Sequence, residues 1–131
     1  MTEILEMSYQ AFSKTDYDAA RKTEPLEQVI DALKEELRTR HILRLQKGDC
    51  SVAAGFIWSD LLTNLERVSD HCSNISGCVL DTVERNMNIH ENQRAFRDSD
   101  EDYIRLFADF EKKYSLPIVL SKMRANNNHK C

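Results

Sequence analysis

Two acidic pairs with the same spacing are the residues of this chain best suited to metal chemistry. Glu27 is followed four residues later by Asp31, and the same spacing separates Glu66 from Asp70. Residues four apart in an α-helix lie on one face, one turn apart. Hard and borderline cations prefer carboxylate oxygens, and helix bundles build metal sites from inward-facing acids. Each pair is therefore predicted to present two oxygen ligands on one helical face.

The turn between the two pairs predicts that they meet. Residues 47–49, Lys-Gly-Asp, are typical of a helix end, with a cation in the last turn and then a glycine for the left-handed position. Glu27 and Asp70 are equally far from this turn along the sequence, and so are Asp31 and Glu66. If the two flanking helices pack antiparallel, all four carboxylates reach the same level of the hairpin.

Such a cluster has to be neutralised, because four carboxylates beside an apolar seam repel one another. A bound cation, raised pKa values or basic neighbours such as Lys34 and Arg67 can do this. Two interpretations follow: a metal site, or a purely structural interaction surface held by salt bridges without metal. The candidate metal ligands are the four acids, with Asn74, one turn beyond Asp70, as an additional oxygen donor: Glu27, Asp31, Glu66, Asp70 and Asn74.

The sequence has no recognisable catalytic motif in addition to these acids. The sequence contains no Glu-x-x-His pair of the kind used by di-iron enzymes, no Ser, His and Asp in a triad order, and no glycine-rich phosphate loop. We therefore expect a protein that is not an enzyme. A metal-dependent enzyme is a third interpretation, and it would require an open coordination position in a pocket.

The composition indicates how these side chains are positioned. Only three glycines and two prolines interrupt 131 residues, 41% of them hydrophobic, which favours a helical domain because sheets need more turn residues. The net charge of −4 disfavours nucleic acid as a partner. No stretch approaches the roughly 20 apolar residues of a membrane span, so the chain is expected to be soluble.

Hydrophobic periodicity predicts four helices. They are expected over residues 2–14, about 15–46, about 51–87 and about 100–114, with a loop over residues 86–99. The first helix is expected to pack through Leu5, Tyr9 and Phe12. Pro25 predicts a kink or a short break in the second helix. The third helix is apolar on more than one side and is therefore expected to be the central one.

Specific segments resemble a known family. Residues 65–75, Leu-Glu-Arg-Val-Ser-Asp-His-Cys-Ser-Asn-Ile, resemble the signature helix of the PhoU family, and residues 24–31 match the partner half of that signature. Residues 41–51 and 113–117 resemble the cytosolic PhoU-like C-terminal domain of bacterial sodium-dependent phosphate cotransporters. The resemblance covers roughly residues 9–117.

The resemblance implies an all-α fold, an antiparallel three-helix PhoU-like bundle with an additional short C-terminal helix. Residues 1–117 would form this single domain, and residues 118–131 a C-terminal tail. A complete PhoU-like domain has two such repeats, so the chain is expected to be a fragment of a longer protein. In the family the Glu-x-x-x-Asp pairs bind metal, which implies a divalent or trivalent ion such as iron or zinc on the four acids.

The resemblance also implies a function and partners. It predicts a cytosolic metal-binding regulatory module of a sodium/phosphate cotransporter, acting in phosphate transport or its regulation through protein interaction. The expected partners are the membrane part of the transporter and a second copy of the chain as a homodimer. The module would be cytoplasmic, tethered to the inner face of the cell membrane as part of a longer transporter.

Overall fold

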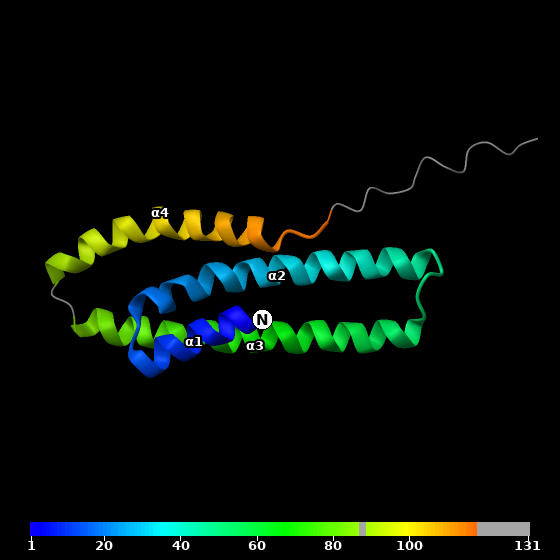
Figure 1. Ribbon diagram of the computed structural model, residues 1–131, viewed down its shortest axis with the longest axis horizontal. Coiled ribbons are helices and arrows are strands. Elements are labelled where there is room, and N and C mark those ends of the chain that lie inside the picture. The colour runs from blue at the N-terminus through cyan, green and yellow to red at the C-terminus, as the bar shows by residue number, and fades with distance from the viewer. Residues whose placement is uncertain (87–88, 118–131) are drawn as a thin grey trace, which may run out of the picture.

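The computed structural model describes the backbone of residues 1–86 and 89–117 and the side chains of residues 1–83, 85 and 101–117. Four helices occupy this part of the chain: α1 (Thr2–Lys14), α2 (Tyr17–Gln46), α3 (Val52–Asn86) and α4 (Ile89–Tyr114). Figure 1 shows them lying alongside one another as an elongated bundle. The predicted all-α bundle is confirmed. The predicted tail, residues 118–131, lies outside the described residues.

The helix ends follow local sequence signals. The Asp16 carboxylate accepts a hydrogen bond from the Ala19 amide at 3.0 Å and caps α2. The Ser51 hydroxyl accepts one from the Ala54 amide at 3.2 Å at the start of α3. Gly48 adopts the left-handed conformation, with φ at 75°, in the turn between α2 and α3. The predicted hairpin turn is therefore confirmed.

The central helix is α2. It packs against α1, α3 and α4, whereas α3 packs against α1 and α2. The prediction that α3 is central was wrong, because side chains such as Phe56 and Ile57 on its further faces are exposed. The main core combines side chains from all four helices: Ile4, Leu26, Val29, Cys72 and Phe110.

The first helix packs through a different face from the predicted one. The side chains expected inside are exposed: Leu5, Tyr9 and Phe12. Those buried instead are Ile4, Ser8 and Ala11. Ala11 packs against Ala19 and Ala20 of α2. Small residues on both sides let the two helix backbones approach closely, and this contact turns the bulky side chains of α1 outward.

Two further corrections concern α2 and α4. Pro25 is buried within α2, and the helix continues through it from Tyr17 to Gln46, so the predicted break is absent. The predicted loop over residues 86–99 was also wrong, because α4 begins at Ile89. Residues 89–99 are polar but contain no glycine or proline, and several of them are good helix formers. Among the described residues, no helix is both long and apolar enough to cross a membrane.

Candidate metal site

The α2–α3 hairpin sets the level of the acidic residues. Figure 1 shows the two helices side by side, joined at one end through the Gly48 turn. Two hydrogen bonds connect them elsewhere: the Ser76 hydroxyl donates to the Thr23 hydroxyl at 2.9 Å, and the Ser73 hydroxyl donates to the Glu24 carboxylate. The two helices run antiparallel, and Glu24 lies opposite Ser73. One turn later on α2 therefore lies opposite one turn earlier on α3.

Three of the predicted acids come together at that level. One carboxylate oxygen from each of Glu27, Asp31 and Asp70 lies within 4.8 Å of the other two. Glu66, the fourth acid, forms an ion pair with Lys34, whose ammonium nitrogen lies 2.6 Å from the carboxylate. The hairpin therefore brings both acidic pairs to one region, with three carboxylates converging and the fourth held by a lysine.

Glu27 is the most perturbed member of this cluster. Its side chain is buried, and Gln28 donates a hydrogen bond to its carboxylate at 3.0 Å. Burial, followed by the negative charges of Asp31, Glu24 and Asp70, raises the pKa of Glu27 to about 7. Near neutral pH this group can therefore bind either a proton or another cation.

Asp31 is perturbed in the same direction. Burial and the nearby Glu66 carboxylate raise its pKa, and Lys34 partly opposes the shift. One oxygen of Asp31, Oδ1, is buried without a hydrogen-bond partner. A buried, unpaired carboxylate oxygen is unfavourable unless a cation or a proton satisfies it.

The donor set fits a metal ion. Oxygens that bind one cation at about 2.0–2.6 Å lie at most about 5 Å from one another, and the three carboxylates meet this limit. All three are oxygen donors, and the set contains no thiolate or imidazole. Glu27, Asp31 and Asp70 could therefore hold one ion between α2 and α3, with Glu66 available if Lys34 moved away.

Two further residues named in the sequence interpretation, Asn74 and Arg67, are exposed. Asn74 is exposed, one turn beyond Asp70 on α3, and its role as a ligand stays a prediction. Arg67, expected as a basic partner, is also exposed. The sequence interpretation did predict Lys34 as a partner, and the ion pair with Glu66 agrees with it.

Two neighbours of the site were missed. Glu24 adds negative charge beside Glu27, and its place one turn earlier on α2 was a signal that could have identified it. Tyr103 of α4 also lies near, since burial and the charges of Glu24 and Glu27 raise its pKa. Nothing in the spacing of the sequence points to Tyr103, because α4 is far from α2 along the chain.

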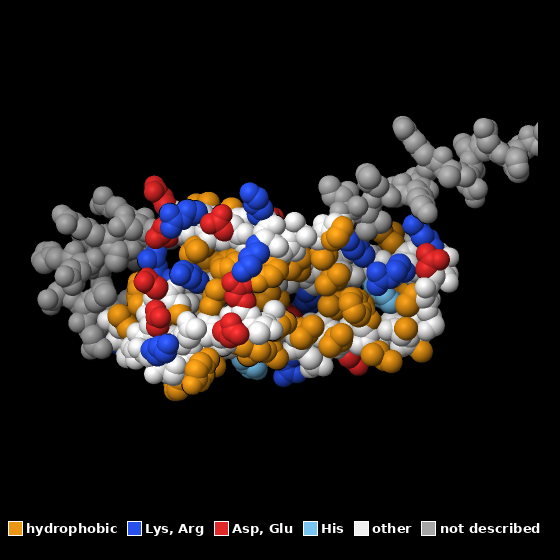
Figure 2. Space-filling view, in the orientation of Figure 1, with side chains coloured by type: hydrophobic (Ala, Val, Ile, Leu, Met, Phe, Trp, Pro, Cys, Tyr) orange, Lys and Arg blue, Asp and Glu red, His pale blue; other side chains and the backbone are white. Residues whose placement is uncertain are grey.

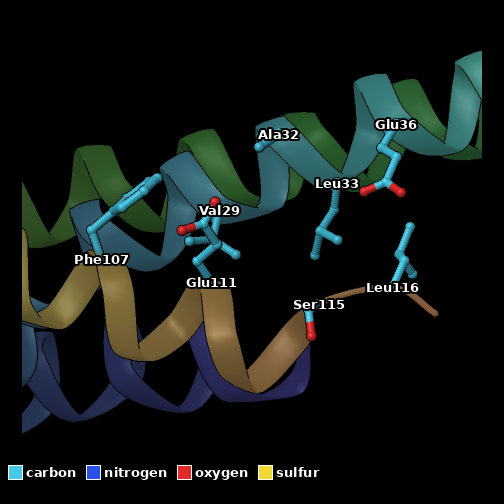
Figure 3. Close-up of a pocket in the computed structure, with 8 residues that line it drawn as sticks. All are labelled: Val29, Ala32, Leu33, Glu36, Phe107, Glu111, Ser115 and Leu116. Atoms are coloured by element: carbon cyan, nitrogen blue, oxygen red, sulfur yellow. The ribbon is translucent and has the colours of Figure 1, made fainter. Parts of the chain in front are cut away.

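A small pocket, separate from the acidic cluster, lies between α2 and the end of α4. This pocket of about 170 Å³ is shown in Figure 3, with the Glu36 and Glu111 carboxylates beside a mostly apolar lining. Its volume is below the roughly 300 Å³ at which small-molecule sites usually begin. The acidic cluster is therefore the stronger candidate for chemistry. The lining residues are Val29, Ala32, Leu33, Glu36, Phe107, Glu111, Ser115 and Leu116.

Comparison with known proteins gives two matches. The PhoU domain model matches residues 1–79. The chain is also 25% identical over 99 residues to a protein of Thermotoga maritima named phosphate-specific transport system accessory protein PhoU homolog 1. That match takes in 76% of this chain and 42% of the relative, so the chain spans less than half of the relative's length. No solved structure matches. Because the domain match includes all of α1 and α2, most of α3 and all four acids, the chain belongs to the PhoU domain family.

Proposed function

We propose that this chain is a metal-binding regulatory module in phosphate transport that acts through protein interaction and carries out no catalysis. The main support is the convergence of three carboxylates from two helices, within reach of one cation, in a chain of the PhoU family. The relative from Thermotoga maritima is named as an accessory protein of a phosphate-specific transport system, which supports the same process for this chain.

The proposed ligands are Glu27, Asp31 and Asp70, joined by Glu66, with Asn74 as an additional donor. A divalent or trivalent ion, iron, zinc or similar, would neutralise their mutual repulsion and join α2 to α3 electrostatically. The buried Asp31 Oδ1 would gain the partner that it otherwise lacks. Binding would therefore stiffen the hairpin and could alter the surface that it offers to a partner.

The proposal that the module belongs to a sodium/phosphate cotransporter rests on the resemblance of residues 41–51 and 113–117 to the PhoU-like domain of sodium-dependent phosphate cotransporters. On this basis the partner is the membrane part of such a transporter, and the module lies in the cytoplasm against the inner face of the cell membrane. The exposed Ile42 and Leu43 within the first of these segments give it apolar side chains for such a contact.

Elemental analysis of protein purified without chelators tests the metal proposal. Wild-type protein should carry iron, zinc or a similar ion in stoichiometric amount, and the Asp31→Asn and Asp70→Asn variants should lose it. Asp81→Asn is the matched control, because Asp81 is exposed on the same helix as Asp70, outside the cluster. Equal metal content in wild type, Asp70→Asn and Asp81→Asn would disprove the assignment of these ligands.

A structural domain without metal is the second candidate. The Lys34–Glu66 ion pair favours it, because a lysine already neutralises one of the four acids. On this view protons on Glu27 and Asp31 would relieve the rest of the repulsion. Metal-free wild-type protein that neither binds added cations nor gains thermal stability from them would support this candidate.

A further inference from the structure

The end of the α2–α3 hairpin, residues 42–57, carries a group of exposed hydrophobic side chains. Single exposed apolar residues are common on protein surfaces, but these are large and lie close to one turn of the chain. Figure 2 shows hydrophobic and basic side chains at the right-hand end of the molecule, where the turn after α2 lies in Figure 1. The members and their exposed fractions are Ile42 48%, Leu43 49%, Val52 68%, Phe56 71% and Ile57 72%.

These side chains surround the hairpin end. Helix α2 ends at Gln46 and α3 begins at Val52. At 1.5 Å per residue, Ile42 and Ile57 lie only about 6–8 Å along the helix axes from those two helix ends. Successive residues of a helix point about 100° apart, so Ile42 and Leu43 face different directions, and a similar angle separates the last two apolar residues on α3. The apolar surface is therefore a cap around the hairpin end, and it is not a stripe along one helix face.

The charge of the hairpin end is opposite to that of the whole chain. Residues 38–58 contain four lysines and arginines and one acid, Asp49, whereas the chain has 18 basic and 22 acidic residues in total. The first two of these cations form ion pairs with acids one turn earlier on α2. Arg44 and Lys47 are exposed and form no ion pair in the part of the chain that the structure describes; Arg44 contacts the ring of His41 at 3.3 Å. The hairpin end thus offers two unpaired cations among its apolar side chains.

This combination fits the surface of an anionic lipid bilayer. Amphipathic elements bury apolar side chains about 5–10 Å into the boundary between headgroups and acyl chains, which includes the depth of the apolar side chains at the hairpin end. Lysine and arginine extend along apolar surface and place their charges at the phosphates. A bilayer can enclose the hairpin end on every side, whereas a folded protein would need a deep acidic pocket to do so.

We propose that the hairpin end docks on an anionic lipid bilayer, with its apolar side chains below the headgroups and Arg44 and Lys47 at the lipid phosphates. The proposal goes beyond the proposed function, because it requires neither a metal ion nor a transporter protein. Asp31 lies 15 residues before Gln46, about 22 Å along α2. The acidic cluster therefore stays clear of the bilayer, and lipid contact would fix the orientation of the hairpin at the membrane.

Co-sedimentation of the full chain with lipid vesicles tests the proposal. Wild-type protein should bind vesicles of equimolar phosphatidylglycerol and phosphatidylcholine, and it should bind pure phosphatidylcholine much more weakly. Added salt should weaken binding to the anionic vesicles, because it screens exposed charges. Trp58, the one tryptophan of the chain, follows Ile57 directly and reports on the hairpin end. Its fluorescence should shift to shorter wavelength on binding and be quenched by lipids with brominated acyl chains.

A charge-matched pair of double variants tests the cations. Arg44→Gln/Lys47→Gln should bind the anionic vesicles about 30-fold more weakly, since each cation near such a surface contributes roughly fivefold in affinity. Lys14→Gln/Lys22→Gln changes the net charge equally and should bind like the wild type. Lys14 ends α1 and Lys22 lies in the second turn of α2, at the end of the bundle away from the turn between α2 and α3 (Figure 1).

A second pair of variants tests the apolar side chains. Phe56→Glu should weaken vesicle binding by about tenfold or more, because it replaces buried apolar area with a charge that the lipid phosphates repel. Tyr9→Glu is the control, since Tyr9 is an aromatic residue of α1 with the same exposed fraction, 71%. It should bind like the wild type, and circular dichroism should show wild-type helicity in every variant that is compared.

Three results would overturn the proposal. One is wild-type protein that does not bind the anionic vesicles, or that binds only vesicles containing a membrane protein, which would make the partner a protein. Another is unchanged affinity in both Phe56→Glu and Arg44→Gln/Lys47→Gln. The third is a loss of binding in Tyr9→Glu alone, which would place the contact on α1. Metal content should be the same in wild type and Phe56→Glu, so the lipid and metal proposals fail separately.

Discussion

The Glu27→Gln substitution should stabilise the metal-free protein at alkaline pH. The surroundings raise the pKa of Glu27 from its ordinary 4.5 to about 7. At 1.36 kcal/mol for each pKa unit, ionising this buried carboxyl destabilises the folded state by about 3 kcal/mol. The contribution of Glu27 to the free energy of unfolding is fully present below about pH 4.5, where the carboxyl is protonated, and it is lost as the pH rises through about 7. A neutral glutamine of nearly the same shape avoids this loss.

Urea denaturation in the presence of a chelator measures the effect. The variant and the wild type should be about equally stable near pH 4.5, and the variant should be more stable by up to about 3 kcal/mol near pH 8. The exposed Glu101 provides the control, since Glu101→Gln should show no such difference between the two pH values. A Glu27→Gln protein that is less stable than wild type near pH 8, or equally shifted at both pH values, would refute the reasoning.

Two further substitutions test the site and the hairpin. Lys34→Met should release Glu66 from its ion pair and increase metal affinity, by about tenfold or more if Glu66 then joins the ligands; calorimetric titration with a divalent cation measures this, and an unchanged or weaker affinity would exclude Glu66. Gly55→Ala should destabilise the protein by about 1–2 kcal/mol in urea denaturation, because its new methyl group would lie 2.9 Å from Nε2 of the buried His41. Gly77→Ala, whose methyl group meets nothing within 4 Å, should instead stabilise it by about 0.5–1 kcal/mol, and equal effects at both glycines would contradict the packing argument.

The turn between α2 and α3 was predicted from local sequence, and the structure confirms it. Gly48 adopts the left-handed conformation there, and this conformation depends only on the residues of the turn itself. The level of Glu27 and Asp70 also followed from the sequence, because an antiparallel hairpin with one defined turn has only one register. The small number of glycines and prolines likewise predicted the all-helical fold of the described residues.

Only the tertiary structure decided which faces meet. Periodicity identified an apolar stripe on α1, but a neighbouring face with the small Ala11 packs more closely against α2 and is buried instead. Lys34 forms an ion pair with Glu66, and Tyr103 comes to Glu24 and Glu27 from a helix far along the chain. These contacts depend on how closely two helices approach, to within a few ångströms. The spacing of residues along one helix does not specify that distance.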